Sequence, residues 1–242
     1  MKKPNKFILL ISLIFGLLAI ALAEANSLDK PNVLFISIDA LRPEHVACYG
    51  YERDTSFNIN RLAKEGVFFR KAIAQSSVAR TSVPSMLTGM YPKNHGVYWF
   101  GDTINPRIAT LAEVLKKAGY RTMGGSVGGR LNYLIGHGVN RGFDKFMDFS
   151  KDEEIAPWIS QWINGSNKTP FFIWAHYCSL HSVSHPPAPY DTLYVDDKLK
   201  PFFAKREPRF YSMPVLIDGE LAEDYKSYYV SQYDGAIRFV DD

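Results

Sequence analysis

Short apolar runs alternate along the chain with segments in which apolar residues recur at helical spacing. The apolar runs are residues 32–38, 120–127 and 170–176. The segments with helical spacing are residues 56–66, 108–118 and 155–163. Continuous apolar and β-branched runs are typical of strands that are buried on both faces of a parallel sheet. Their alternation with amphipathic helices predicts an α/β fold, with a largely parallel or mixed central sheet flanked by helices.

The ends of these segments carry their own signals. Ser56 is a suitable N-cap for the first helical segment, and Gly66 and Gly119 follow helical segments as stops. Residues 182–214 are rich in Pro, Tyr and charge without a clear period, which indicates a surface excursion over the edge or active face of the sheet. A helical pattern covers residues 220–242 without a stop signal, so we expect a domain that is truncated at its C-terminus.

The first 23 residues have the pattern of a signal peptide. Three lysines precede an almost unbroken apolar stretch, residues 7–23, which closes on Ala21-Leu22-Ala23. Signal peptidase recognises this small-x-small pattern, so we expect export to the periplasm or the extracellular space and a mature domain of residues 24–242. An uncleaved membrane anchor is the alternative, because about 17 apolar residues approach the length of a spanning helix.

Removal of this segment changes the charge balance. The full chain has 28 Lys and Arg residues against 25 Asp and Glu residues, and the signal segment contains three lysines and no acid. The mature chain is therefore formally neutral, which gives no support for nucleic-acid binding. The two cysteines, Cys48 and Cys178, lack metal-site spacing, and in an exported protein they form either a disulfide or two buried thiols.

Polar side chains stand at the ends of two predicted strands. Asp39 directly follows the first strand, while His176 and His181 lie at and just beyond the end of the 170–176 strand. If these strands are parallel, all three residues reach the same edge of the sheet, where α/β proteins bind ligands. This arrangement predicts a metal or substrate site. The alternatives are that Asp39 caps the following turn and that the histidines are ordinary core or surface residues.

Longer stretches of the sequence match, in order, the motifs of a known family. They read "PNVLFISIDALRPEHVACYGY", "FNINRLAKEGVFFRKAIAQS" and "SMLTGMYPKNHGV", followed by "TLAEVLKKAGYRT", "NRGFDKF", "FFIWAHYCSLHSVSHPPAPYD" and "YDGAIRFVDD". On these motifs the chain resembles the N-terminal part of the sulfatase family, within the alkaline-phosphatase-like superfamily. The resemblance implies an α/β sandwich with a large mixed sheet. It also implies hydrolysis or transfer of sulfate or phosphate esters with a divalent metal, usually calcium.

The resemblance assigns roles to the residues at the strand ends. Asp39 corresponds to a metal ligand of the family, and the metal would stabilise the ester oxygens as a Lewis acid. His181 corresponds to a histidine that contacts the substrate ester, and His176 to the histidine at the end of a W-x-H-Y strand. Ala40 stands where many members have a second Asp. The remaining metal ligands of the family come from a later strand, beyond Asp242.

The family's nucleophile has no counterpart at the matching position. Counted back from Thr88-Gly89, that position is Ala79, and Ser82 falls on the serine of the motif. A methyl group cannot attack sulfur or phosphorus, so the family's covalent mechanism is not available at this residue. Ser77 and Thr81 lie two residues away on either side and are candidate replacements. Direct activation of water by the metal is a further possibility.

Two neighbouring features bear on substrate binding. Arg80 could hold an anion beside position 79, with a solvated surface arginine as the other interpretation. Residues 124–132 read "GGSVGGRLN", lack the Lys and His that many sulfatases have there, and leave Arg130 as the only cation of the segment. We expect a flexible loop, since the spacing of the glycines does not match a dinucleotide-binding motif.

Three functions remain open from the sequence. The first is hydrolysis of sulfuric esters of small molecules or glycans by an exported, metal-dependent enzyme, with Ala79 as the obstacle. The second is a phosphoryl or phosphoethanolamine transferase of the same superfamily, since the "SVPSM" run resembles those proteins too. The third is an inactive exported binder of sulfated or other anionic glycans.

Overall fold

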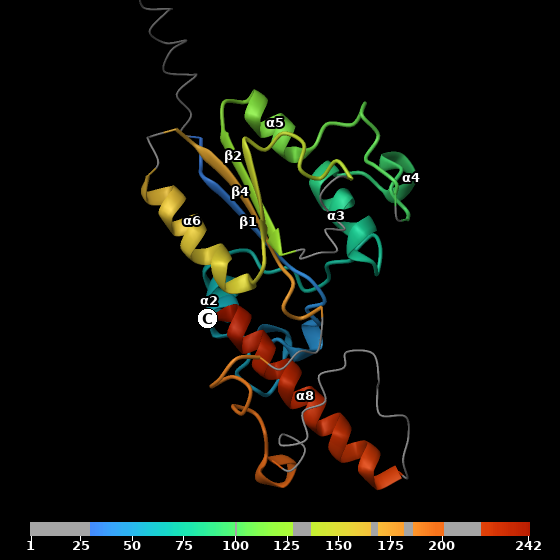
Figure 1. Ribbon diagram of the computed structural model, residues 1–242, viewed down its shortest axis with the longest axis vertical. Coiled ribbons are helices and arrows are strands. Elements are labelled where there is room, and N and C mark those ends of the chain that lie inside the picture. Colours follow the sequence, from blue (N-terminus) through green and yellow to red (C-terminus); the bar gives the residue numbers. More distant parts are fainter. Residues whose placement is uncertain (1–29, 100, 128–136, 166–168, 182–185, 201–218) are drawn as a thin grey trace, which may run out of the picture.

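A four-stranded parallel sheet forms the centre of the computed structural model (Figure 1). The structure describes residues 30–99, 101–127, 137–165, 169–181, 186–200 and 219–242. In sheet order the strands are β1 (Val33–Ile38), β4 (Phe171–Tyr177), β2 (Arg121–Val127) and β3 (Lys145–Phe149). The predicted α/β class and the three predicted strands are confirmed, and the described sheet is parallel throughout.

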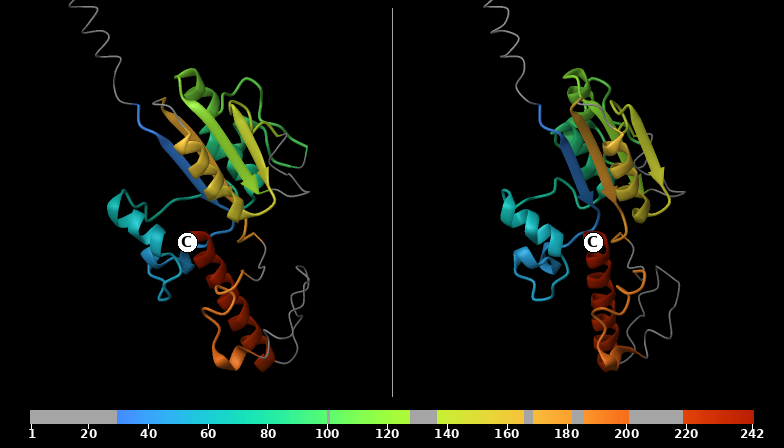
Figure 2. Two further views of the ribbon diagram at one scale, coloured as in Figure 1. Left: turned by 60° about the vertical axis from the view of Figure 1, so that its left-hand side comes forward. Right: turned by 90° about the vertical axis from the view of Figure 1, so that its left-hand side faces the viewer.

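Helices cover both faces of this sheet (Figure 2). α3 (Ala79–Thr88) and α5 (Leu111–Lys117) cover one face, and α6 (Ile155–Asn164) covers the other. The further α-helices of the described residues are α2 (Phe57–Glu65), α4 (Pro92–His95) and α8 (Gly219–Asp241). Successive residues of β4 alternate between the two faces. Ile173 packs with residues of α6, whereas Phe172 and Trp174 pack with residues of α3 and α5. Every residue of β4 except Tyr177 is buried, as predicted for a strand covered on both sides.

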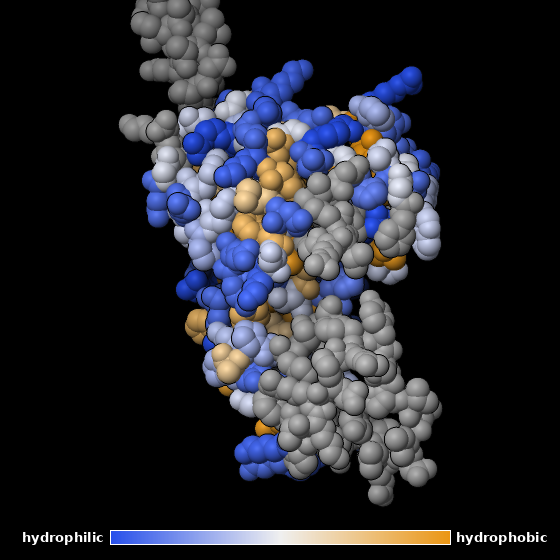
Figure 3. All heavy atoms as spheres, viewed as in Figure 1, coloured by the Kyte–Doolittle hydropathy of each residue, from blue (hydrophilic) through white to orange (hydrophobic). Residues whose placement is uncertain are grey.

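The prediction that the first strand is buried on both faces is wrong. Leu34 is 47% exposed and Ile36 is 48% exposed. The reason is the position of β1 as the outer strand of the sheet, because the α6 cluster includes residues of β2 and β4 but none of β1. Apolar side chains also gather in a strip over the sheet, between hydrophilic borders, in the view of Figure 3.

The helix predictions are confirmed, with differences at two N-termini. α5 begins at Leu111 rather than at residue 108 because Thr110 and Glu113 form a reciprocal capping box. The backbone N–H of Glu113 donates to the Thr110 hydroxyl at 3.2 Å, and the Glu113 carboxylate accepts the Thr110 N–H at 2.8 Å. α6 and α8 fall where the apolar spacing places them.

Ser56 occupies the N-cap position of α2, but the predicted capping bond is absent from the described structure. Its hydroxyl accepts the N–H of Ala47 at 3.1 Å instead. Asp241, at the end of α8, accepts the backbone N–H groups of Asn58 and Ile59 at 2.6 and 2.8 Å. A carboxylate distant in sequence therefore stabilises the start of α2, where the helix dipole favours negative charge.

Some parts of the fold escaped the sequence patterns. β3, α3 and the short helix α4 were not predicted as regular elements. The expectation of a loop from residue 124 is wrong for Gly124 and Gly125, which belong to β2. A Cβ atom at Gly125 would lie 2.6 Å from the ring of Phe149, so glycine allows this ring to pack on the strand. Residues 128–132, with Arg130, lie outside the described residues.

Two other predicted segments also fall wholly or partly outside the described residues. The signal segment, residues 1–23, is one of them. Of the predicted excursion, residues 186–200 are described and contain only a 3₁₀ turn, Asp197–Leu199, and irregular structure. No helix among the described residues is long and apolar enough to cross a bilayer.

A fully buried carboxylate joins α8 to the segment after β1. Asp234 accepts hydrogen bonds from the Tyr51 hydroxyl and from Nη1 of Arg53, each at 2.7 Å, and lies 2.7 Å from Nδ1 of His45. Burial and the bond to Asp234 both raise the pKa of Tyr51, which stays protonated and donates. This cluster holds α8 beneath the carboxyl ends of the strands (Figure 1).

A second buried cluster joins α3 to α4 through His95, which is fully buried. Nδ1 of His95 accepts the Val97 N–H at 3.1 Å, so Nε2 carries the proton and donates to the Ser85 hydroxyl at 3.0 Å. The Ser85 hydroxyl in turn donates to the Thr81 carbonyl at 3.3 Å. Burial lowers the pKa of His95, so the ring is neutral at pH 7.

Replacing Asp234 with Asn should lower the free energy of unfolding by about 3 kcal/mol, because His45 and Arg53 then lose a buried charged partner. The low end of the usual range applies because the Arg53 side chain is 37% exposed. Urea unfolding measures the change. Glu223→Ala, which removes an exposed ion pair with Lys226, is the control and should cost less than about 0.5 kcal/mol. Equal losses in the two variants would contradict this role of Asp234.

His95 should make stability fall as the pH decreases. Its folded pKa lies below the ordinary value of about 6.5, so the unfolded chain binds a proton that the folded chain does not. The contribution is complete above about pH 6.5 and is lost below it, with a slope of up to about 1.4 kcal/mol per pH unit. Unfolding of His95→Gln between pH 7.5 and 5 should show a lower stability at pH 7.5 but a shallower slope. An unchanged slope would refute the assignment.

Candidate active site

The pairing of β1 with β4 brings the predicted residues to one edge of the sheet. Ser37 lies opposite His176 in the register, and the Asp39 N–H donates to the Tyr177 carbonyl at 2.9 Å. A carboxylate oxygen of Asp39, a ring nitrogen of His176 and Sγ of Cys178 all lie within 4.8 Å of one another. The expectation that Asp39 and His176 share an edge is confirmed, and the structure adds Cys178.

His176 is held in one orientation from inside the sheet. The side chain is 2% exposed, and its Nδ1 lies 2.8 Å from the Ser37 hydroxyl, which also accepts the indole N–H of Trp174 at 2.9 Å. Nε2 is buried and has no hydrogen-bond partner among the described residues. Burial lowers the pKa of His176, against the opposing effect of Asp39 and Asp152, and this favours the neutral ring.

The turn after β4 is fixed by a buried acid that the sequence patterns did not reveal. The Asp152 carboxylate accepts the backbone N–H groups of Cys178 at 3.0 Å and Ser179 at 2.7 Å. The N–H of His181 donates to the Cys178 carbonyl at 2.9 Å, which closes the turn. His181 on this turn is exposed to solvent, whereas His176 in β4 is buried, so the two predicted histidines occupy very different environments.

The turn after β1 is supported by α8. Ala40 has a φ of 56°, a left-handed conformation that is costly for a residue with a side chain. The Tyr233 hydroxyl donates to the Ala40 carbonyl at 2.7 Å and accepts the Arg42 N–H at 2.9 Å. Tyr233 therefore fixes the backbone directly after Asp39 from an element that lies almost 200 positions later.

α3 begins at Ala79, the position that corresponds to the family's nucleophile. The Ala79 methyl packs against the core cluster, and the N-cap residue Val78 supplies no side-chain bond to the first turn. Thr81 is buried, and its hydroxyl lies 3.4 Å from the Tyr98 carbonyl, to which it donates. Ser77 is exposed, just before the helix. The two candidate hydroxyls therefore differ in access to a substrate.

The other residues predicted on this segment are less accessible. Arg80 is only 5% exposed, so its interpretation as a solvated surface arginine is wrong. Its Nη1 donates to Nε2 of His137 at 2.8 Å, and Nδ1 of His137 donates to the Asp102 carbonyl. Ser82 is half-buried in the first turn of α3. The Arg80 contact with the His137 ring shows that this guanidinium already takes part in a contact within the protein.

The donor set at the sheet edge does not fit calcium. Calcium prefers six to eight oxygen ligands, whereas this cluster offers one carboxylate, one imidazole and one thiol. Nitrogen and sulfur donors suit zinc and similar transition metals. Cys178 lies just beyond β4, which ends at Tyr177, so the His-x-Cys spacing alone did not show that the thiol lies beside His176. Cys48 and Cys178 are both half-buried and are not joined in a disulfide.

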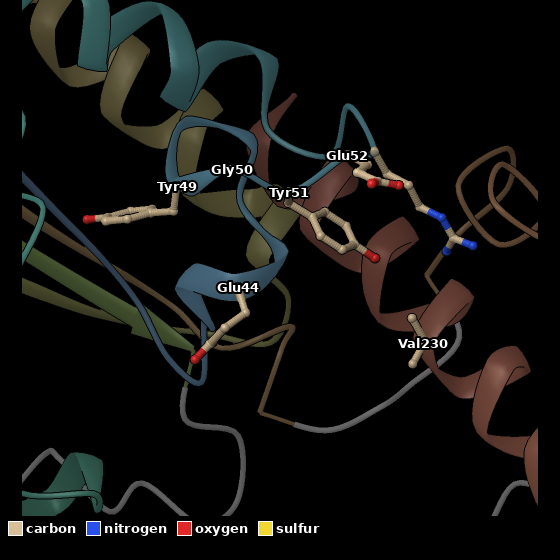
Figure 4. A pocket seen from close by; sticks show the side chains of 7 residues that line it. Glu44, Tyr49, Gly50, Tyr51, Glu52 and Val230 are labelled. Carbon is tan, nitrogen blue, oxygen red and sulfur yellow. The ribbon is translucent and has the colours of Figure 1, made fainter.

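A pocket of about 480 Å³ lies elsewhere, between α8 and the segment after β1 (Figure 4). Its lining residues are Glu44, Tyr49, Gly50, Tyr51, Glu52, Arg53 and Val230. In Figure 4 the Tyr51 ring points toward α8, whereas Tyr49 lies on the other side of its loop. None of the predicted site residues lines this pocket. Convergence of ligand atoms, rather than pocket size, therefore places the candidate site at the sheet edge.

Sequence comparison identifies relatives of this chain. The family model for sulfatases matches residues 31–242. Arylsulfatase H of Canis lupus familiaris is 32% identical in an alignment of 167 positions that covers 56% of this chain and 30% of that protein. N-acetylgalactosamine-6-O-sulfatase of Bacteroides thetaiotaomicron is 37% identical over 121 residues, which are 48% of this chain and 23% of that protein. The chain thus spans less than a third of the length of these relatives.

Solved structures of sulfatases and related enzymes have the same fold as this chain. BT4656, in complex with its substrate D-glucosamine-2-N,6-O-disulfate, has a TM-score of 0.62 at 17% identity, over 88% of this chain and 60% of that one. The periplasmic domain of phosphoethanolamine transferase EptC from Campylobacter jejuni has a TM-score of 0.53 at 17% identity, over 88% of this chain and 61% of that one. Such low identities establish the fold alone. Together with the family match over residues 31–242, they lead to one conclusion: the chain belongs to the sulfatase family.

Proposed function

We propose that this chain is part of an exported, divalent-metal-dependent hydrolase of sulfate esters on sugars. The observation that carries the proposal is the convergence of Asp39 and His176 at the carboxyl edge of β1 and β4. The relatives support the chemistry, since their names describe sulfatases, one of them acting on N-acetylgalactosamine-6-O-sulfate groups. The sugar class is further supported by the sulfated glucosamine bound to BT4656.

The N-terminus of α3 is the proposed seat of the sulfate group. The helix is ten residues long, and its first turn has no side-chain cap. Backbone N–H groups and the helix dipole favour an anion at such an end. The family resemblance supports the same location, because Ala79, which it matches to the nucleophile position, is the first residue of the helix. Sulfate binding at α3 would leave the ester oxygen facing solvent and the exposed Ser77.

Ser77 is the nucleophile that the geometry favours. Thr81 is buried and its hydroxyl donates to a backbone carbonyl, so its use would require the first turn of α3 to open. Ser77 precedes the helix and is exposed. Attack of its oxygen on sulfur, with loss of the hydroxyl proton to solvent, would form a serine sulfate ester and break the bond between sulfur and the sugar oxygen. Water would later hydrolyse this ester, which releases sulfate and restores the serine hydroxyl.

His181 is the proposed general acid. The departing sugar oxygen needs a proton, and an imidazole that is exposed beside the sheet edge can donate one in its protonated form. Its backbone is fixed by the turn that Asp152 anchors. His176 is buried and is better suited to hold a ligand than to exchange protons with solvent.

Because Ala79 has no nucleophilic group, it favours one second function, the binding of sulfated or other anionic glycans without turnover. The same helix terminus and the same edge residues would hold the ligand, and no nucleophile would be needed. The transferase alternative has weaker support, because the likeness to phosphoethanolamine transferase is one of fold alone.

Export and dependence on a divalent metal are also part of the proposal. The signal-like pattern of residues 1–23 supports export. Calcium is the metal that the family resemblance implies, and it would need oxygen donors besides Asp39, so no step of the reaction is assigned to it.

Hydrolysis should depend on Ser77 and not on Thr81. We expect Ser77→Ala to reduce kcat for an aryl sulfate by at least about 10³-fold, the scale of losing a nucleophile, and Thr81→Ala to change it less than about threefold. The measurement is release of the phenol by the complete mature protein, with aryl phosphate assayed in parallel.

Circular dichroism and thermal unfolding of both variants provide the control for folding. Loss of activity in Thr81→Ala alone would contradict the choice of nucleophile. Turnover of aryl phosphate without turnover of aryl sulfate would contradict the sulfate-ester hydrolase and support the phosphoryl-transferase alternative. Binding of a sulfated oligosaccharide without turnover by the wild type would replace the hydrolase with the glycan binder.

A further inference from the structure

We infer that Asp39, His176 and Cys178 form a zinc-type metal site with a nitrogen, sulfur and oxygen donor set, in place of an all-oxygen calcium site. The inference rests on the proposed function, because the metal would occupy the same edge of the sheet. Its basis is the three ligand atoms that lie within 4.8 Å of one another.

The geometry of the three donors suits a tetrahedral ion. Zinc bonds of about 2.0–2.3 Å separate ligand atoms by roughly 3.3–3.8 Å in a tetrahedron. The three ligand atoms lie within 4.8 Å of one another, so small side-chain rotations would bring them to these distances. Asp39 and Cys178 are half-buried and border the solvent, which allows an ion to enter. Three protein ligands leave the fourth position for water or an ester oxygen, as in catalytic zinc sites.

The orphaned nitrogen of His176 is the independent observation that points to a ligand. A buried polar atom without a hydrogen-bond partner is costly, and few such atoms persist in folded proteins. Nε2 of His176 is such an atom among the described residues. The other ring nitrogen, Nδ1, already contacts the Ser37 hydroxyl at 2.8 Å. Nε2 is therefore the nitrogen that remains to bind an ion.

The surroundings of His176 have the arrangement that metal-binding histidines use. With Nδ1 protonated and donating to the Ser37 hydroxyl, the lone pair of Nε2 faces the metal. The indole of Trp174 donates to the same hydroxyl at 2.9 Å and fixes it in place. This chain of bonds sets the orientation of the ring before an ion arrives.

Cys178 is positioned through its backbone. Asp152 accepts the Cys178 N–H, which fixes the turn from which the thiol projects toward Asp39 and His176. A thiol binds the ion as thiolate after losing its proton, and sulfur donors discriminate strongly against calcium. Cys178 is thus the residue that distinguishes this site from a hard-metal site.

Cobalt and zinc binding by the purified protein test the inference. The wild type loaded with Co²⁺ should show a thiolate-to-metal charge-transfer band, and Zn²⁺ should displace Co²⁺ with loss of that band. Competition with a chromophoric chelator should show that Cys178→Ser weakens Zn²⁺ binding by about 100-fold or more. A loss of this size lies at or above the upper end of the roughly 10–100-fold range that is typical when a partner of a metal ligand is removed, as expected for a direct ligand.

Cys48→Ser is the matched control, because Cys48 is the other half-buried thiol and has no place in the cluster. It should keep both the band and the wild-type affinity. Absence of the band in the wild type, or equal Zn²⁺ affinity in Cys178→Ser and the wild type, would overturn the inference. The wild-type spectrum decides even where a variant fails to fold.

The binding data separate this inference from the proposed function. Aryl sulfate turnover with Ca²⁺, without zinc binding, would overturn the zinc site and leave the hydrolase standing. Zinc binding that requires Cys178, without turnover of any ester, would support the site and overturn the hydrolase.

Discussion

The parallel pairing of β1 with β4 is the constraint on which the candidate site depends. It places Ser37 opposite His176 and ties Asp39 to Tyr177 through a backbone hydrogen bond. Because side chains alternate along a strand, a slip of one residue would turn His176 to the opposite face and separate it from Asp39. The burial of β4 on both faces resists such a slip, because another register would require its core contacts on both faces to be repacked.

Elements distant in sequence then fix the two turns that carry Asp39 and Cys178. Tyr233 of α8 holds the strained turn at Ala40, and Asp152 holds the turn at Cys178. Asp234 attaches α8 to the segment after β1 through buried charged hydrogen bonds. The precision of the site therefore depends on the packing of α8 as well as on the sheet. This explains how a short cluster at a sheet edge can be held ready for a ligand.

Local patterns were sufficient to predict the three apolar strands, their parallel direction and the meeting of Asp39 with His176. They failed where partners distant in sequence decide the outcome. The exposure of Leu34 follows from the outer position of β1, and the cap of α2 comes from Asp241 rather than from Ser56. α3 has a Ser-, Thr- and Pro-containing sequence without a clear apolar stripe, so its helical state was not evident. The contribution of Cys178 required knowledge of how the chain turns after β4.

X-ray absorption of the zinc-loaded protein tests the central claim most directly, because it reports the atoms bound to the ion. The β1–β4 register with its two fixed turns predicts a first shell that contains one sulfur at about 2.3 Å and nitrogen or oxygen donors at about 2.0–2.2 Å. A first shell of oxygen and nitrogen donors without sulfur would contradict the claim that this edge of the sheet assembles Asp39, His176 and Cys178 into one metal site.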